Sequence, residues 1–124
     1  MKGMSKMTSY IIEGGKRLEG EVDVSGSKNA SLPILASCIL NSGVTKLYNV
    51  PEIRDTRITQ EILKFLGCKV KKHKGKIEIN SQEITKKEIP EHLMHQMRST
   101  VILAGAILGR FREVRFSYPG DCDI

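Results

Sequence analysis

The sequence is poor in aromatic residues and in cysteine. Its 124 residues include no tryptophan, three tyrosines, three phenylalanines and three cysteines. An odd number of cysteines with no CxxC pair argues against a disulfide framework and against a zinc site. We therefore expect reduced thiols and no bound metal.

Long hydrophobic runs are absent as well. The first ten residues contain two lysines and no apolar core, so they do not form a secretory signal. The longest strongly apolar run, residues 101–108, is far too short to cross a bilayer. We expect the chain to lie in the cytoplasm.

The overall composition is that of a globular protein with a basic charge balance. Hydrophobic residues make up 40% and charged residues 27%, which argues against disorder and fibrous classes. The formal net charge is +6. A basic surface favours anionic partners, and nucleic acid, nucleotides and phosphorylated metabolites all qualify.

Hydrophobic periodicity predicts alternating strands and helices. Period-two alternation marks a strand at 18–25, after a shorter candidate at 10–12. A helical pattern covers 30–40. A second helical pattern follows, which Asp55 or Thr56 can cap at its start and Gly67 can end. Further strands are predicted at 44–50, 68–72 and 76–80, followed by a helix at 91–108 that Gly109 ends and a last strand at 114–118.

The order β-α-β-α-β-β, followed by the start of a second such unit, indicates an α/β (α+β) sandwich of helices on a sheet. Residues 25–29, Ser-Gly-Ser-Lys-Asn, lie between the first long strand and a helix. The helix N-terminus, the ammonium of Lys28 and the amide of Asn29 suit a phosphate or carboxylate. The alternative is a capped helix start with an exposed lysine.

Three other features could carry chemistry. Cys122 follows Pro-Gly-Asp on a loop and could act as nucleophile or general acid, or be an incidental surface thiol. Arg98 is predicted on a largely buried helix, where it needs a ligand anion or a route to the surface. The lysine-rich hairpin at 69–76 could bind nucleic acid, but no aromatic residue interrupts it, which favours a solvated hairpin.

Taken together, these motifs resemble the UDP-N-acetylglucosamine 1-carboxyvinyltransferases, a family of enolpyruvyl transferases. The resemblance rests on residues 25–36 (SGSKNASLPILA), 48–51 (YNVP), 55–56 (DT), 97–99 (MRS) and 118–124 (YPGDCDI). It extends from about Tyr10 to Ile124. The related shikimate-pathway enzyme shares a lysine at the first motif but lacks the Lys-Asn pair and the cysteine loop.

The resemblance implies a two-domain inside-out α/β barrel built from βαβαββ units, of which this chain holds part. Residues 1–26 would be N-terminal strands that belong to the other domain. Residues 27–124 would be the incomplete first part of the enolpyruvyl-transferase domain.

It also implies a reaction that requires no metal or organic cofactor. The enolpyruvyl group of phosphoenolpyruvate moves to the 3′-hydroxyl of UDP-N-acetylglucosamine and phosphate leaves, the committed step of peptidoglycan precursor synthesis. Lys28 and Asn29 would hold phosphoenolpyruvate, and Arg98 would contact substrate near the reacting centre. Cys122 would be the general acid and the residue that fosfomycin alkylates.

Two departures qualify the resemblance. Asp121 stands where the family has a second glycine, and the chain stops at Ile124, before an arginine-containing loop of the family. We therefore expect the 124 residues alone to be inactive. A stand-alone module that binds anions or nucleic acid, and a fragment that self-associates through open sheet edges, remain alternatives.

Overall fold

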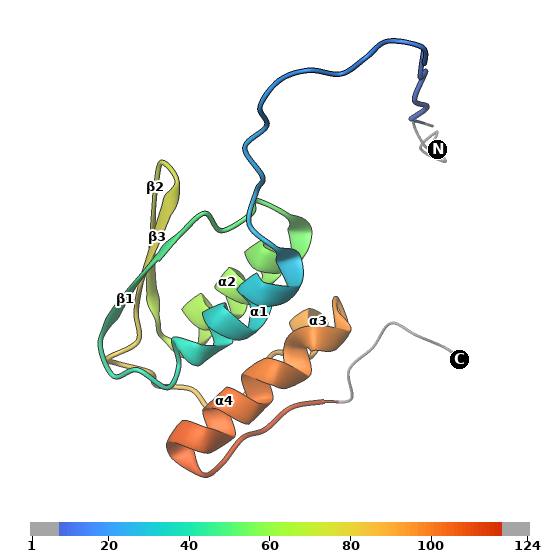
Figure 1. Ribbon diagram of the computed structural model, residues 1–124. Coiled ribbons are helices and arrows are strands. Elements are labelled where there is room, and N and C mark those ends of the chain that lie inside the picture. The colour runs from blue at the N-terminus through green and yellow to red at the C-terminus, as the bar shows by residue number, and fades with distance from the viewer. Residues whose placement is uncertain (1–7, 118–124) are drawn as a thin grey trace, which may run out of the picture.

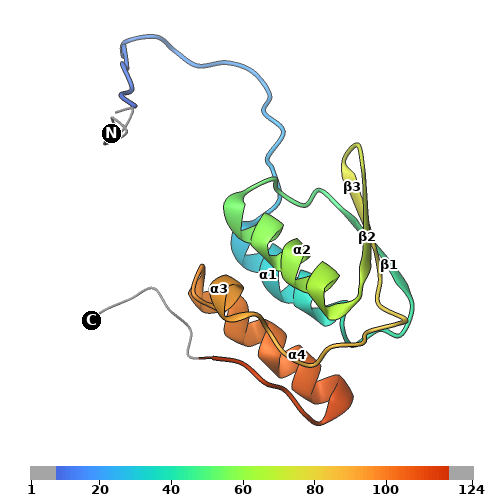
Figure 2. The same ribbon diagram turned by 180° about the vertical axis from the view of Figure 1, so that it is seen from behind.

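A small antiparallel sheet is covered on one face by two helices, and a third long helix packs on their far side. The computed structural model describes residues 8–117. The elements in chain order are α1 (Lys28–Ser37), β1 (Val44–Tyr48), α2 (Arg54–Leu66), β2 (Lys69–His73), β3 (Lys76–Asn80), α3 (Glu91–Met94), the 3-10 turn η1 (Arg98–Thr100) and α4 (Val101–Phe111). Figures 1 and 2 show the sheet, the α1–α2 layer and α4 as successive layers.

The strand order is β1-β3-β2, so the hairpin strand β3 lies in the centre. Ile79 pairs with Thr45 on one side and Val70 on the other, and Ile77 pairs with Leu47. Both isoleucines are buried. Because side chains alternate along a strand, this face packs on the helices and the other face carries the charged residues, among them Lys46, Lys71 and Glu78.

The first helix begins earlier than the sequence pattern predicts. Ser27 is its N-cap, and the Ser27 hydroxyl oxygen accepts a hydrogen bond from the Ala30 N–H at 3.3 Å. The prediction of a helix at 30–40 was wrong at both ends, because α1 spans Lys28–Ser37 and a turn follows it. Pro33 therefore lies inside the helix instead of in its first turn. It leaves the Asn29 carbonyl without its helical donor.

The second helix is closed by a threonine hydroxyl at its start and by a glycine at its end. Its N-cap is Ile53, not Asp55 or Thr56 as predicted. Thr56 instead acts from the third helical position, where its hydroxyl accepts from the Ile53 N–H at 3.3 Å and lies 2.7 Å from the Pro51 carbonyl oxygen. Gly67 ends α2 with φ +115°, a left-handed conformation that favours glycine, as predicted.

The helix predicted at 91–108 is broken in two. Met97 has extended φ and ψ of −159° and 143°, which separates α3 from η1 and α4. The helix then continues past Gly109 to Phe111 and ends at Arg112, whose φ is +59°. The strand predicted at 114–118 is present in the described part only as a parallel bridge between Arg115 and Glu88.

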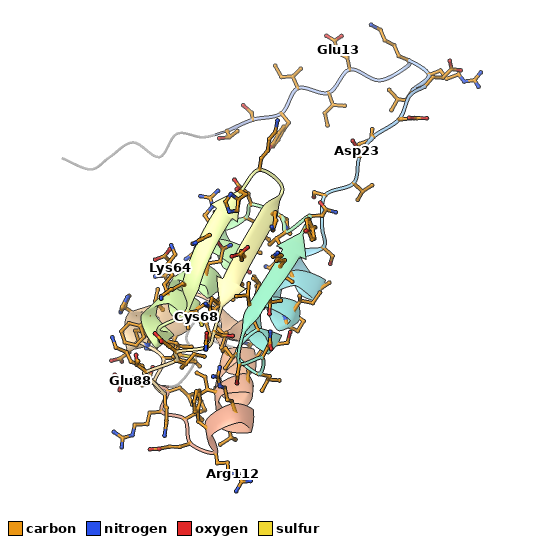
Figure 3. The ribbon with its side chains drawn as sticks, turned by 90° about the vertical axis from the view of Figure 1, so that its left-hand side faces the viewer. Glu13, Asp23, Lys64, Cys68, Glu88 and Arg112 are labelled. Atoms are coloured by element: carbon orange, nitrogen blue, oxygen red, sulfur yellow. The ribbon has the colours of Figure 1, made fainter. Side chains whose placement is uncertain are left out.

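The strands predicted at 10–12 and 18–25 do not form within residues 8–117. That segment runs away from the body as an extended chain, where Figure 3 places Glu13 and Asp23. Its apolar side chains are almost fully exposed, Leu18 at 94% and Val22 at 87%. A strand needs a hydrogen-bonding neighbour, and the described residues offer none to this segment. Among the helices described, none is long and apolar enough to span a membrane.

Polar contacts at the end of α1 join three elements. Arg110 of α4 donates from Nη1 to the carbonyl oxygens of Ile39 at 2.9 Å and Ser81 at 2.7 Å, and from Nη2 to that of Gln82 at 3.4 Å. The buried Ser81 hydroxyl lies 2.6 Å from the Cys38 carbonyl oxygen and also contacts that of Asn41. These contacts pair carbonyls of the turn that follows α1 and of the segment that follows β3.

Replacing Arg110 by alanine should destabilise the fold by about 3 kcal/mol, because three carbonyls lose a charged donor. Arg110→Lys should recover less than half of this, since lysine lacks the planar guanidinium whose Nη1 and Nη2 together reach the three carbonyls. Urea unfolding at pH 7 measures both. Arg57→Ala is the control, because Arg57 makes a single 3.5 Å contact to Glu52. Equal losses for Arg110→Ala and Arg57→Ala would contradict the assignment.

Stability should also fall at high pH because of a buried thiol. Burial, and then the charge of neighbouring Cys38, raise the pKa of Cys68 from 9.0 to about 11, while Arg110 opposes the shift. Between these values the unfolded chain has lost the proton that the folded chain keeps, so unfolding becomes easier as pH rises from about 9 to about 11. Cys68→Ala should show a shallower decline over this window in urea titrations. Parallel declines of the two proteins would refute the role of Cys68.

Candidate functional site

Three helices begin at the same end of the helix layers. Figures 1 and 2 both show α1, α2 and α4 running side by side with their N-termini together. Residue contacts agree, because Lys28 at the start of α1 meets Asp55 at the start of α2, and Arg110 near the end of α4 meets the end of α1. Each helix start carries a partial positive charge, so this end attracts anions.

Lys28 is fixed at this end by an ion pair. Its Nζ lies 2.6 Å from Asp55 Oδ2, and the two side chains are 54% and 19% exposed. Asn29, the next residue on the first turn of α1, is exposed. The predicted pair therefore stands on a helix N-terminus, as expected, with ammonium and amide donors open to solvent.

Arg98 lies on η1, immediately before α4, and its side chain is exposed. The prediction that it sits on a largely buried helix was therefore wrong. The break at Met97 changes the direction of the chain, so Met94, Met97 and Thr100 are buried while Arg98 faces solvent. The start of α4 thus adds a full positive charge to the end of the layers where Lys28 lies.

A hollow of about 280 Å³ opens between the start of α1 and the end of β1. It is lined by Gly26, Ser27, Ala30, Ser31, Ile34, Leu47, Tyr48, Asn49 and Val50. Gly26 packs so closely there that a Cβ would lie 1.9 Å from the Asn49 carbonyl oxygen. This contact requires glycine and fixes where the chain enters α1.

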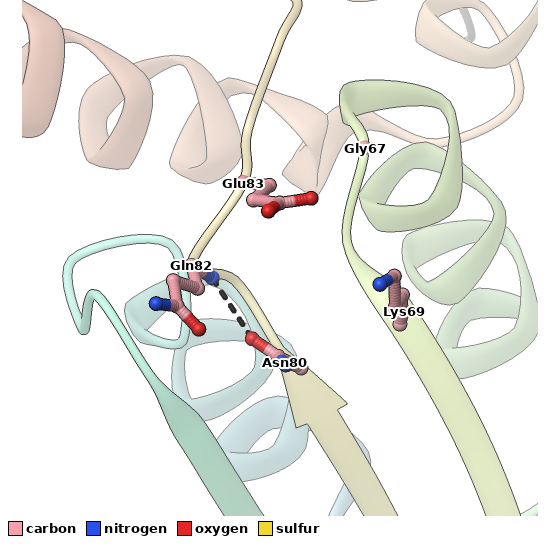
Figure 4. A pocket seen from close by; sticks show the side chains of 5 residues that line it. All are labelled: Gly67, Lys69, Asn80, Gln82 and Glu83. Carbon is pink, nitrogen blue, oxygen red and sulfur yellow. Dashed lines mark hydrogen bonds between the residues drawn. The ribbon is translucent and has the colours of Figure 1, made fainter.

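A second hollow lies away from the helix starts. Figure 4 shows it between Gly67, Lys69, Asn80, Gln82 and Glu83, with the Gln82 N–H donating to Asn80 Oδ1 at 3.0 Å. Its volume of about 40 Å³ has room for little more than water. The site therefore rests on the helix N-termini and not on this cavity. Within residues 8–117, no group of three metal-ligating side chains occurs.

The remaining predicted residues divide into two groups. Cys122 and its loop lie outside the described residues. The lysines of the β2–β3 hairpin are mostly exposed, as the solvated-hairpin interpretation predicts. The structure places one aromatic residue beside this hairpin, which the linear sequence did not reveal. Tyr48 is 68% exposed and pairs across the sheet with Lys76, which in turn pairs with His73.

Asp55 is the site residue that sequence reasoning did not identify as such. It was interpreted as a helix cap, whereas its carboxylate pairs with Lys28 across 27 positions of sequence. The available signal was its place on the first turn of the second helix, just after Pro51. Only the fold shows that α1 and α2 run parallel, which brings their first turns together (Figure 1).

Comparisons with known proteins agree with this fold. Residues 12–124 match the EPSP synthase (3-phosphoshikimate 1-carboxyvinyltransferase) family. The chain is 45% identical over 118 residues to a UDP-N-acetylglucosamine 1-carboxyvinyltransferase 2 of Caldanaerobacter subterraneus and 42% identical to a UDP-N-acetylglucosamine 1-carboxyvinyltransferase of Desulfatibacillum aliphaticivorans. Each match covers 95% of this chain and 28% of the relative.

A solved structure supports the same architecture. The enolpyruvyl transferase NikO from Streptomyces tendae superposes with a TM-score of 0.68 over 79% of this chain and 23% of that protein, at 24% identity. The βαβαββ order expected from the sequence is present from its first helix onward. The chain, which spans little more than a quarter of the length of the relatives it matches, belongs to the EPSP synthase family of enolpyruvyl (1-carboxyvinyl) transferases.

Proposed function

We propose that this chain is the N-terminal part of an enzyme that transfers the enolpyruvyl group of phosphoenolpyruvate to the 3′-hydroxyl of UDP-N-acetylglucosamine, with release of phosphate. The observation that carries the proposal is the identity of 45% over nearly the whole chain to a relative named for that activity. The first motif supports the nucleotide-sugar reaction over the shikimate one, since it contains both Lys28 and Asn29.

The helix N-termini supply the anion site of this proposal. Lys28 and Asn29 bind phosphoenolpyruvate, whose negative charge the starts of α1, α2 and α4 also attract. Arg98, exposed at the start of α4, contacts substrate near the reacting centre. Cys122 protonates the methylene carbon as the tetrahedral intermediate forms. The solvent-exposed surface beside Lys28 leaves room for the two substrates.

In this proposal the reaction is the committed step of peptidoglycan precursor synthesis and takes place in the cytoplasm. The enzyme thereby serves cell-wall growth, cell shape and division. Fosfomycin inactivates it by alkylating Cys122, which opens the epoxide and forms a carbon–sulfur bond.

Residues 1–26 belong, in the same proposal, to the sheet of another domain. Residues 18–25 place Leu18, Val22 and Val24 on one side and Glu19, Glu21 and Asp23 on the other, which suits one buried and one solvated face. All three apolar side chains are more than four-fifths exposed. In the 124 residues by themselves, this apolar segment would pair with the same segment of another copy.

A hybrid enzyme tests the activity. This chain replaces the 118 matched residues of the Caldanaerobacter relative, and phosphate release from phosphoenolpyruvate is measured with UDP-N-acetylglucosamine. The hybrid should turn over. Lys28→Ala should lower kcat/KM at least about a hundredfold, because it removes a charge aimed at the anion. Cys122→Ala should lower kcat about a thousandfold.

Lys64→Ala is the matched control, since Lys64 also lies on a helix and its ammonium also pairs with a carboxylate, that of Glu61, at 2.9 Å. It should leave turnover unchanged. Phosphate release that depends on shikimate 3-phosphate and not on UDP-N-acetylglucosamine would overturn the proposed substrate. Equal effects of Lys28→Ala and Lys64→Ala would overturn the proposed anion site.

The 124-residue chain alone should associate as its concentration rises. The double variant Val22→Asp, Val24→Asp should remain monomeric, because charged side chains cannot be buried against a second copy. Light scattering over a hundredfold concentration range measures this. Lys16→Ala, Arg17→Ala is the control, because it makes the same net charge change of −2 in the same segment but outside 18–25. A wild-type chain that stays monomeric at every concentration refutes the pairing.

A further inference from the structure

The ion pair between Lys28 and Asp55 is short, and its two side chains differ in their exposure to solvent. Lys28 Nζ lies 2.6 Å from Asp55 Oδ2, with the lysine side chain about half exposed and the aspartate side chain only 19% exposed. Asp55 occupies the first turn of α2, where the helix N-terminus favours a negative charge. The Asp55 carbonyl also accepts a hydrogen bond from the Thr59 hydroxyl at 2.9 Å, which adds to the order of that turn. The carboxylate is thus the fixed member of the pair and the ammonium the open one.

The pair is not needed to hold the two helices together. Helices α1 and α2 already pack through buried side chains, among them Leu35, Ile62 and Leu63, which are 0% exposed. An ion pair whose lysine is half exposed contributes little to stability, because water screens it and the lysine loses rotamer freedom. Its main effect is therefore on the position of the Lys28 ammonium.

An ammonium group has three donors, and Asp55 uses one of them. The other N–H groups stay available on the exposed side, at the end of the layers where three helices begin. A free lysine would lose its rotamer freedom each time an anion bound. With the ammonium already anchored, that loss has occurred before the ligand arrives.

We infer that Asp55 is a positioning residue, which orients the Lys28 ammonium for the anionic substrate without touching that substrate itself. The inference rests on the proposed function, since it assigns Lys28 to phosphoenolpyruvate. It adds that the aspartate on α2 belongs to the same binding unit as the lysine on α1. Asp55 and Lys28 must then act on substrate binding as one coupled pair.

The hybrid enzyme described above tests this coupling. Asp55→Asn should raise KM for phosphoenolpyruvate about tenfold, leave KM for UDP-N-acetylglucosamine unchanged, and change kcat less than KM. Asp55→Glu should recover part of the loss, because it restores the carboxylate. In a Lys28→Ala background, Asp55→Asn should have no further effect. Glu61→Gln is the matched control, a carboxylate-to-amide change on the same helix at a lysine-paired position.

The outcomes separate the two proposals. If Asp55→Asn costs the same with and without Lys28, Asp55 acts independently and the inference is overturned. If Lys28→Ala itself leaves KM for phosphoenolpyruvate unchanged, the proposed anion site fails first. If KM for both substrates rises equally, Asp55 supports the fold and not the position of Lys28.

A second measurement on the 124-residue chain does not depend on activity. The Lys28 ammonium should give a slowly exchanging 1H–15N signal at low temperature, because Asp55 protects it, and the signal should broaden in Asp55→Asn but not in Glu61→Gln. Titration with phosphoenolpyruvate should shift this signal in the wild-type chain. A Lys28 signal equally broad in wild type and Asp55→Asn overturns the inference even if the hybrid is inactive.

Discussion

The arrangement of the helices depends on the carbonyl cluster at the end of α1. Arg110 and Ser81 together contact the carbonyls that follow this helix, so α4 and the end of β3 are tied to one point. Gly109 permits the close approach of α4 to the end of α1, because a Cβ at this position would lie 3.3 Å from the Leu40 side chain. With their C-terminal ends joined in this way, α1 and α4 must run in the same direction. Their N-termini therefore meet at the opposite end.

Parallel neighbouring helices repel one another through their aligned dipoles, so this arrangement has an electrostatic cost. Arg110 offsets it at one end, where a positive charge faces the negative ends of the helices. Asp55 offsets it at the other end, next to the first turns of α1 and α2. Arg110 and Asp55 therefore each reduce the charge of the helix ends beside them, while Lys28 and Arg98 keep the N-terminal end positive. An anion is attracted only to the end that holds Lys28 and Arg98.

Local signals predicted most of the fold, and long-range contacts account for what they missed. The β2–β3 hairpin and the glycine that ends α2 follow from alternation and from Gly67, both of which act within a few residues. The strand at 18–25 failed because a strand depends on a neighbour, and no described strand lies beside it. The pair of Lys28 with Asp55 and the contacts of Arg110 join residues far apart in sequence, so no periodicity could reveal them. The motif at Lys28 and Asn29 was nonetheless found, because a helix start followed by a cation is a local pattern.

The exposure of the site sets what these residues can do by themselves. Lys28 and Arg98 face water, where a full charge interacts with an anion far more weakly than in a dry pocket. Asp55 further reduces the net charge beside Lys28, which lowers general attraction for anions but leaves directional N–H donors in place. Such an arrangement gives orientation more than affinity. Substantial binding then requires further groups that cover this end and exclude water. The proposed function assigns the acid catalysis to Cys122.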